Sequence, residues 1–161
     1  MNDVMDRAAA ADDRTLVLDR HLDAPRAAIW RCWTEPELIV QWFTPAPWST
    51  VSADVDLRPG GRSRVVMQSP EGQDFPNDGV YLAVEPERRL VFTDAFTEGW
   101  LPAGRPFFAA EITLADEGSG TRYRAVARHW TDEARAEHEK MGFHDGWNAA
   151  ANQLEALAKT L

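Results

Sequence analysis

The chain has 161 residues, enough for one domain with a sizeable core but not comfortably for two. Its formal net charge of −9 argues against nucleic acid and against anionic membranes as partners, because both require a positive protein surface. A single cysteine, Cys32, excludes an internal disulfide, and no apolar run approaches the roughly 18 residues of a membrane helix, so we expect a cytoplasmic protein.

The N-terminal part predicts a loose tail, a strand and two short helices. Residues 1–12 show no apolar period, so we predict a disordered or loosely attached tail before a single domain over residues 13–161. From Thr15 apolar and polar residues alternate, as in a strand with one buried face. Pro25 favours the first turn of a helix, and Thr34 with Glu37 fits a capping box at the start of a second helix.

The middle of the chain changes to a period of two. Six strands are predicted there, over residues 51–57, 63–67, 80–84, 90–96, 108–114 and 123–129. Residues 97–106 hold two glycines and two prolines and are predicted to form a loop. Turns containing glycine separate several of these strands, which indicates an antiparallel sheet connected by hairpins.

Residues 131–161 carry the period of a helix, with Thr131 as its predicted N-cap. Gly142 and Gly146 indicate either a close backbone approach or a break in this helix. The order of elements predicts an α+β fold. In it, a curved antiparallel sheet of about seven strands surrounds a long C-terminal α-helix, with two short helices after the first strand.

Several short motifs occur in a specific order along the chain. They are Ile29-Trp30, Thr34, Glu37-Leu38, Trp42-Phe43, Pro59-Gly60-Gly61-Arg62, Gly79 to Val84-Glu85-Pro86, Arg89-Leu90-Val91-Phe92-Thr93, Gly120-Thr121-Arg122, and Gly146-Trp147 with Leu154. Over about residues 14–160 this order resembles the SRPBCC (START-like, helix-grip) superfamily and, within it, the activator of heat-shock protein 90 ATPase, C-terminal-domain type family. The resemblance implies a sheet gripping the last helix, with an apolar cavity between them.

The leading hypothesis is a module that binds a small apolar or aromatic ligand in that cavity. We expect its lining to comprise Met67, Tyr81, Phe92, Phe96, Phe108, Tyr123, Phe143 and Trp147. Its mouth is expected near Trp48 and the 97–106 loop. We expect no cofactor. We also expect no metal, because His138-Glu139 resembles the start of a zinc-protease helix motif but the second histidine of that motif is missing.

Polar candidates lie on the same predicted faces. Asp94 shares the face of Phe92 and Phe96, so it is either a carboxylate among aromatic rings or is turned to solvent by the strand twist. His129 and His144 are candidate ligand anchors or acid–base groups, the alternative being satisfied interior or rim histidines. His138 is expected to be solvent-exposed.

Two other functions stay open. One is an enzyme of the cyclase or hydrolase type that uses Asp94, His129 or His144. The other is a stress-related, co-chaperone-like interaction module, as the family name implies. The co-chaperone has a further domain that engages the chaperone, for which 161 residues leave no room, so we do not expect a chaperone partner. A homodimer is left open. Arg122, Arg124 and Arg128 are expected on the outer sheet face, solvated or as an interaction strip.

Overall fold

The computed structural model describes residues 13–161, and the tail predicted over residues 1–12 lies outside them. Within the described part, the predicted α+β order is confirmed. The elements are β1 (Thr15–Leu22), α2 (Arg26–Thr34), α3 (Pro36–Trp42), β2 (Ser49–Val55), β3 (Arg62–Gln68), β4 (Asp74–Glu85), β5 (Arg89–Thr93), β6 (Phe96–Thr97), β7 (Leu101–Pro102), β8 (Phe108–Glu117), β9 (Gly120–His129), α4 (Asp132–Lys140) and α5 (Phe143–Ala158).

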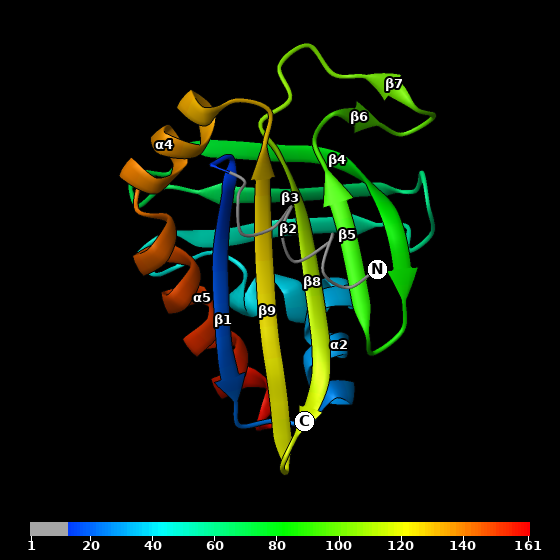
Figure 1. Cartoon of the computed structure of the whole chain (residues 1–161), viewed down its shortest axis with the longest axis vertical. Helices are drawn as coiled ribbons and strands as arrows, with labels where there is room; N and C mark the ends of the chain where they lie inside the picture. The colour runs from blue at the N-terminus through cyan, green and yellow to red at the C-terminus, as the bar shows by residue number, and fades with distance from the viewer. Residues whose placement is uncertain (1–12) are drawn as a thin grey trace.

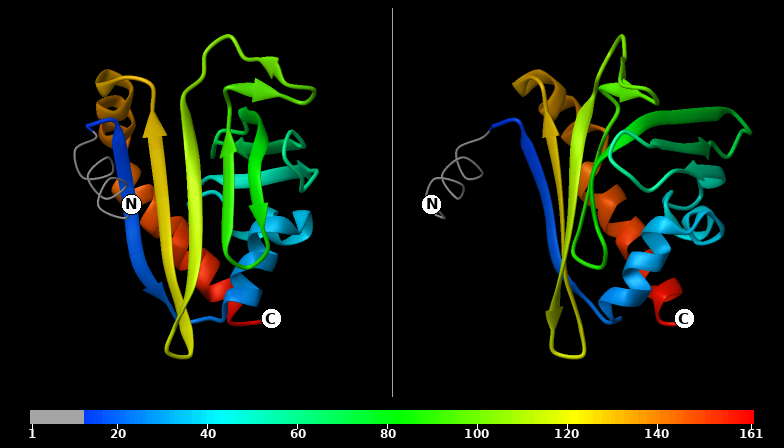
Figure 2. Two further views of the ribbon diagram at one scale, coloured as in Figure 1. Left: turned by 45° about the vertical axis from the view of Figure 1, so that its right-hand side comes forward. Right: turned by 90° about the vertical axis from the view of Figure 1, so that its right-hand side faces the viewer.

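Seven of the strands form one antiparallel sheet in the order β1-β9-β8-β5-β4-β3-β2. Neighbours in sequence are neighbours in the sheet except for β1, which returns to pair with β9 along its whole length. The sheet bends so far that β2 and β3 run across the direction of β1, β9 and β8 (Figure 1). The turned views show α5 together with α2 and α3 on the concave side (Figure 2). Helices α2, α3 and α5 therefore all pack on one face of the sheet, its concave face.

The two short helices are held to each other and to α5 by buried and partly buried hydrogen bonds. The Trp42 indole N–H donates to the backbone oxygen of Cys32 at 2.8 Å. The side-chain amide of Gln153 donates to the backbone oxygens of Trp42 and Thr44 at 2.8 and 2.9 Å. These bonds satisfy carbonyl groups at the ends of α2 and α3, so the helices form a fixed wall beside α5.

The predicted capping box at the start of α3 is wrong. Glu35, not Thr34, precedes the first turn, and no side chain caps it. The Thr34 hydroxyl instead donates to the backbone oxygen of Trp30 at 2.8 Å, one turn back in α2. Pro36 occupies the first helical position and lacks an N–H, which leaves less for a cap to satisfy.

The C-terminal helical region is broken, which was one of the two predicted alternatives. Gly142 separates α4 from α5 and adopts a left-handed conformation with φ of 100°. Thr131 caps α4 as predicted, its hydroxyl oxygen accepting from the backbone N–H of Ala134 at 3.0 Å. The break lets α4 turn against the end of β9 while α5 crosses the concave face (Figure 1).

The predicted loop over residues 97–106 contains a small hairpin. Its strands β6 and β7 are two residues long and pair only with each other. Trp100, at its tip, packs so closely on Gly60 that a Cβ there would lie 2.8 Å from the indole ring. The hairpin is therefore anchored to the turn before β3 by a glycine contact.

The main core lies between the concave face and the helices. Its fully buried side chains include Leu22, Ile29, Leu90, Ile112 and Leu154. The same alternation that predicted the strands places these residues on the inner face of the sheet or on the facing helices. Within residues 13–161, no helix is long and apolar enough to cross a membrane.

Candidate functional site

A pocket of about 480 Å³ lies between the concave face of the sheet and the helices α3 and α5. Its walls come from five parts of the fold: the two short helices, strands β3 to β5, the start of β8, Tyr123 of β9, and the α4–α5 region. The apolar and aromatic side chains among them are Trp33, Ile39, Trp42, Phe43, Pro45, Val65, Met67, Tyr81, Leu90, Phe92, Phe107, Phe108, Tyr123, Met141, Phe143, Trp147, Ala150 and Ala151. This space is apolar over most of its surface.

The structure brings together most of the side chains predicted to line a cavity. Around the pocket lie Met67, Tyr81, Phe92, Asp94, Phe108, Tyr123, Phe143 and Trp147. Four predicted residues, Trp48, Phe96, His129 and His144, do not line it. Placement in the lining is a geometric finding, and the ligand-binding role of these residues stays a prediction.

The four outlying residues each have another partner. Trp48 is 38% exposed and packs on Phe75, with ring centroids 5.2 Å apart. Phe96 packs on Trp100 in the β6–β7 hairpin. The alternation rule fails at Phe96 because β5 ends at Thr93, so the strand face does not continue to this residue.

Asp94, His129 and His144 do not converge on one point. His144 is exposed, and its Nε2 lies 2.8 Å from the Glu139 carboxylate. His129 is buried behind His138 rather than in the pocket wall. The three residues that the enzyme hypothesis named as alternative acid–base groups therefore do not form a single cluster, and only Asp94 lines the pocket.

Asp94 faces the pocket, and its carboxylate is held by the backbone. The N–H of Phe107 donates to both carboxylate oxygens, at 2.8 and 2.9 Å, and the N–H of Phe108 donates to one of them at 3.2 Å. The side chain thus ties the end of β5 to the start of β8. Of the two alternatives left open by the sequence, the inward one is found.

Three aromatic side chains of α2 and α3 were missed as lining residues. Trp33, Trp42 and Phe43 form edge-on contacts with centroids 4.8 to 6.0 Å apart, and Trp33 also contacts Phe92 across the pocket wall at 5.8 Å. Their spacing on two short helices predicted a buried face, which is correct, but did not indicate that this face borders an open space. The seven tryptophans of the chain are a signal that could have found Trp33 and Trp42, since these large apolar rings suit pocket walls as well as cores.

The tyrosines and the cysteine are not ionised near neutral pH. Burial raises the pKa of Tyr81 to about 12, against a smaller opposite effect of the Ser63 hydroxyl. Burial also raises the pKa of Tyr123 far above its usual value, with Trp33 acting against it. The Cys32 thiol is fully buried and its pKa is raised to about 11, so it is a core residue rather than a nucleophile.

His138 was expected in solvent, and this is wrong. It is only 9% exposed, and its Nδ1 lies 2.8 Å from Nε2 of His129. The ring is packed against Phe107 and Phe143, with centroids 4.9 and 5.2 Å away. The break at Gly142 turns α4 onto the end of β9, which brings the two histidines together and places His138 in the pocket wall.

The electrostatics of this pair follow from its burial. Burial, together with a smaller effect of the nearby His129, lowers the pKa of His138 to about 4. His138 is therefore neutral at physiological pH. No group of three or more histidine, cysteine or carboxylate side chains within residues 13–161 is arranged to hold a metal ion.

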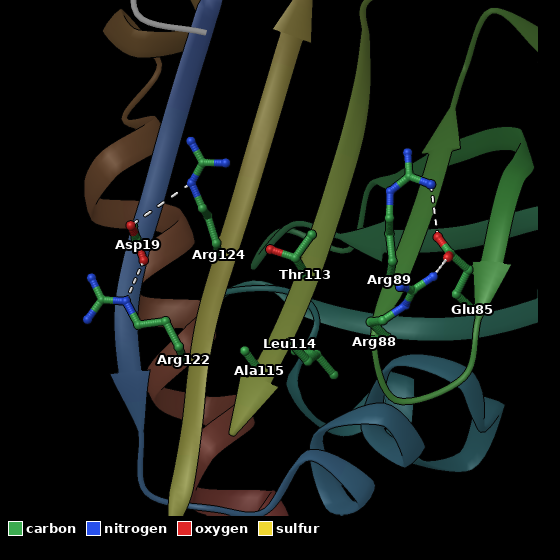
Figure 3. A pocket seen from close by; sticks show the side chains of 9 residues that line it. All are labelled: Asp19, Glu85, Arg88, Arg89, Thr113, Leu114, Ala115, Arg122 and Arg124. Atoms are coloured by element: carbon green, nitrogen blue, oxygen red, sulfur yellow. Dashed lines mark hydrogen bonds and ion pairs between the residues drawn. The ribbon is translucent and has the colours of Figure 1, made fainter. Parts of the chain in front are cut away.

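A second hollow, of about 450 Å³, lies on the outer face of the sheet (Figure 3). Arg122 and Arg124 border it from β9, and Arg88 and Arg89 from the β4–β5 turn. Asp19 accepts from Arg122 at 2.7 Å. The arginines of β9 lie on the outer face as predicted, and acidic neighbours in the sheet offset part of their charge.

Glu111 of β8 lies on the same outer face and pairs with two arginines. Arg89 and Arg128 donate to its two carboxylate oxygens at 2.6 and 3.0 Å. Burial acts to raise the pKa of Glu111, but the two arginines outweigh it and hold the pKa below its usual value. The outer face is thus a network of exposed ion pairs, each of which contributes little to stability.

The sequence matches a family model described as Activator of Hsp90 ATPase homolog 1-like protein over residues 23–159. A crystal structure from Nitrosomonas europaea is 47% identical, with a TM-score of 0.89 over 92% of this chain and 96% of that one. A Mycobacterium smegmatis structure is 28% identical, with a TM-score of 0.77 over 91% of each chain. An AHSA1-like protein from Aeromonas hydrophila, 21% identical with a TM-score of 0.69 over 91% of this chain and 92% of that one, shares the fold. No curated protein matches the sequence.

Proposed function

This chain belongs to the family of Activator of Hsp90 ATPase homolog 1-like proteins, and we propose that it binds a small apolar or aromatic molecule in the pocket beneath its curved sheet. The observation that carries the proposal is the pocket itself, about 480 Å³ of space lined mainly by apolar and aromatic side chains. A plain core would be packed to nearly the density of an organic crystal, leaving no space of that size.

The driving force would be the removal of apolar surface from water. Each Å² of apolar surface buried contributes about 25 cal/mol, so a ligand with two aromatic rings gains several kcal/mol before its loss of freedom is subtracted. The rings of Trp33, Trp42 and Phe92 already pack against one another in the pocket wall. Because these rings are held in place by packing on one another, little ordering cost opposes binding.

The exposed lining residues suggest where a ligand enters. Met141 is 71% exposed, and Asn77 and Asp78 on β4 are exposed as well, yet all three border the pocket. Trp48, which the sequence placed at the mouth, is not among the lining residues. We therefore propose an entrance between β4 and the α4–α5 link.

The test uses a neutral fluorescent probe, N-phenyl-1-naphthylamine, titrated into the full chain. We expect saturable binding and a rise in melting temperature with probe concentration, since a ligand that binds only the folded state stabilises it. The variant Ala150→Trp places a large ring in the pocket wall and should weaken probe affinity by about tenfold or more, the equivalent of about 1.4 kcal/mol.

The matched control is Ala156→Trp, which adds the same ring at an exposed position of the same helix. It should leave the probe affinity unchanged. Absence of saturable binding to the wild type, or equal weakening by both substitutions, would remove the support for a ligand pocket.

A further inference from the structure

Most polar side chains around the pocket are already hydrogen-bonded within the protein. Asp78 accepts from Arg64 at 2.8 Å, and the Thr93 hydroxyl donates to the backbone oxygen of Phe108 at 3.0 Å. The Asp94 carboxylate accepts backbone N–H groups, including that of Phe108. A ligand with a polar group would compete with these bonds rather than complete them.

His138 and Trp33 differ from these residues. The buried indole N–H of Trp33 also has no hydrogen-bond partner within residues 13–161, but it can only donate, whereas a histidine nitrogen can accept. Nδ1 of His138 is bonded to His129, but no group in residues 13–161 forms a hydrogen bond with its Nε2. The side chain is more than nine-tenths buried, between the rings of Phe107, Phe143 and Trp147, all of which line the pocket. Because the two nitrogens are on opposite sides of an imidazole, Nε2 is directed away from His129 and toward this aromatic surround.

The hydrogen bonds determine which nitrogen carries each proton. Nδ1 of His129 lies 2.8 Å from the backbone oxygen of Arg14, which can only accept, so this nitrogen carries a proton. In the neutral ring, Nε2 of His129 is then bare and accepts from Nδ1 of His138. The second ring nitrogen of His138, Nε2, is consequently bare too, and is a hydrogen-bond acceptor.

We propose that Nε2 of His138 is the polar anchor of the pocket, and that it selects ligands carrying a hydroxyl or N–H donor on an otherwise apolar body. This inference rests on the proposed ligand-binding function. Three steps support it: a backbone carbonyl fixes the tautomer of His129, His129 fixes that of His138, and the remaining acceptor lies among pocket-lining rings. His138 is neutral at physiological pH, so the acceptor is available there.

The choice of ligand follows from the cost of burying polar groups. A donor that enters the pocket and meets Nε2 replaces the hydrogen bond it made to water. A bound ligand without a donor leaves Nε2 of His138 buried and without a hydrogen-bond partner. In a pocket that lacks this acceptor, the donor of a ligand is likewise left without a hydrogen-bond partner. Discrimination between ligands with and without a donor therefore depends on Nε2 of His138.

The test compares 2-naphthol with 2-methoxynaphthalene, which share the ring system and the oxygen but differ in the O–H donor. Binding is measured at pH 7.5 by calorimetry on the wild-type chain, His138→Leu and a control, His144→Gln. We expect the wild type and the control to prefer 2-naphthol by about tenfold, consistent with the net contribution of one hydrogen bond. His138→Leu should lose this preference while still binding 2-methoxynaphthalene.

The outcomes separate the two proposals. If neither naphthalene binds the wild type, the ligand-binding function fails and the anchor fails with it. If both bind with equal affinity, the pocket stands and the anchor is refuted. A preference for 2-naphthol that survives His138→Leu and disappears in Asp94→Asn would show that the ligand's O–H donates to the Asp94 carboxylate. This outcome also refutes the anchor.

A second measurement does not depend on any variant folding. Two-bond ¹H–¹⁵N correlation spectra of the ¹⁵N-labelled wild type report which nitrogen of each imidazole carries the proton. We expect both His129 and His138 to carry it on Nδ1 at pH 7.5, with Nε2 of His138 shifted when 2-naphthol is added. A proton on Nε2 of His138 in the free protein would contradict the proposed relay.

Discussion

Gly146 is a small residue in the first turn of α5, at the wall of the pocket. A Cβ built there would have only one neighbour within 4 Å, Cγ of Pro45 at 4.0 Å, and the backbone is ordinary helix. Gly146→Ala should therefore raise the free energy of unfolding by about 0.5–1 kcal/mol, because alanine loses less backbone entropy in a helix. Chemical denaturation checks the change.

The contrasting substitution is Gly79→Ala on β4. Its Cβ would lie 2.2 Å from the backbone oxygen of Thr93, so the two strands would have to move apart. We expect a clear loss of stability there. A loss at Gly146 as well would mean that α5 approaches its neighbours more closely than the structure indicates.

Single positions were predictable where strand alternation alone decides the side-chain direction. Tyr123 and Phe92 follow from their strand patterns and do face inward. His138 could not be predicted, because its burial depends on how α4 turns after Gly142 and meets β9. On the sequence of α4 alone, His138 stands among charged residues and suggests an exposed face.

The link between α4 and α5 shows how one residue sets the course of two elements. Gly142 has φ of 100°, and a Cβ there would meet nothing within 4 Å. Any cost of substitution is therefore backbone strain rather than a clash. Gly142→Ala should lower the free energy of unfolding by about 1–2 kcal/mol, the cost of a left-handed conformation for an L-residue.

Gly142→Asn provides the matched comparison, since asparagine tolerates the left-handed region better than alanine does. We expect it to retain more of the wild-type stability than the alanine variant in thermal unfolding. Equal stability of the wild type and both variants would show that the link does not require a positive φ.

At the scale of elements, the long periodic segments were predictable and the short ones were not. Five or more alternating residues identify a strand, so all seven strands of the main sheet were predicted. The hairpin of β6 and β7 has two residues per strand, too few to show a period. The predicted capping box was wrong because a threonine at this position also fits the end of the preceding helix. There the Thr34 hydroxyl donates to the backbone oxygen of Trp30, one turn earlier.

The whole molecule depends on one pairing that no local pattern reveals. β1 lies at the opposite end of the sequence from β9 yet pairs with it residue by residue, from Thr15 opposite Arg128 to Leu22 opposite Thr121. This long-range pairing places the helices after β1 on the concave side of the sheet, beside α5 (Figure 2). Hydrophobic periodicity indicated the strands, and the resemblance to a known family implied a curved sheet around the last helix, but neither predicted that β1 pairs with β9.

The packing that buries His138 also links the stability of the whole fold to pH. Its pKa is lowered to about 4, whereas in the unfolded chain it is near the ordinary value of 6.5. Between these values the unfolded chain binds a proton that the folded chain does not, so stability falls as pH falls from about 6.5 toward 4. We expect a loss of about 2 kcal/mol between pH 7 and pH 5 from this residue.

The carboxylates with lowered pKa values, Glu35, Glu111 and Glu139, affect stability mainly below their ordinary pKa of 4.5, which is outside the range from pH 7 to pH 5. Urea denaturation at pH 7, 6 and 5 therefore isolates the histidine contribution. His138→Phe should flatten the dependence in this range, whatever its stability at pH 7, and His144→Gln should keep it. A variant lacking His138 with an unchanged slope would show that the acid sensitivity arises from other groups, and that His138 is not held neutral by its burial.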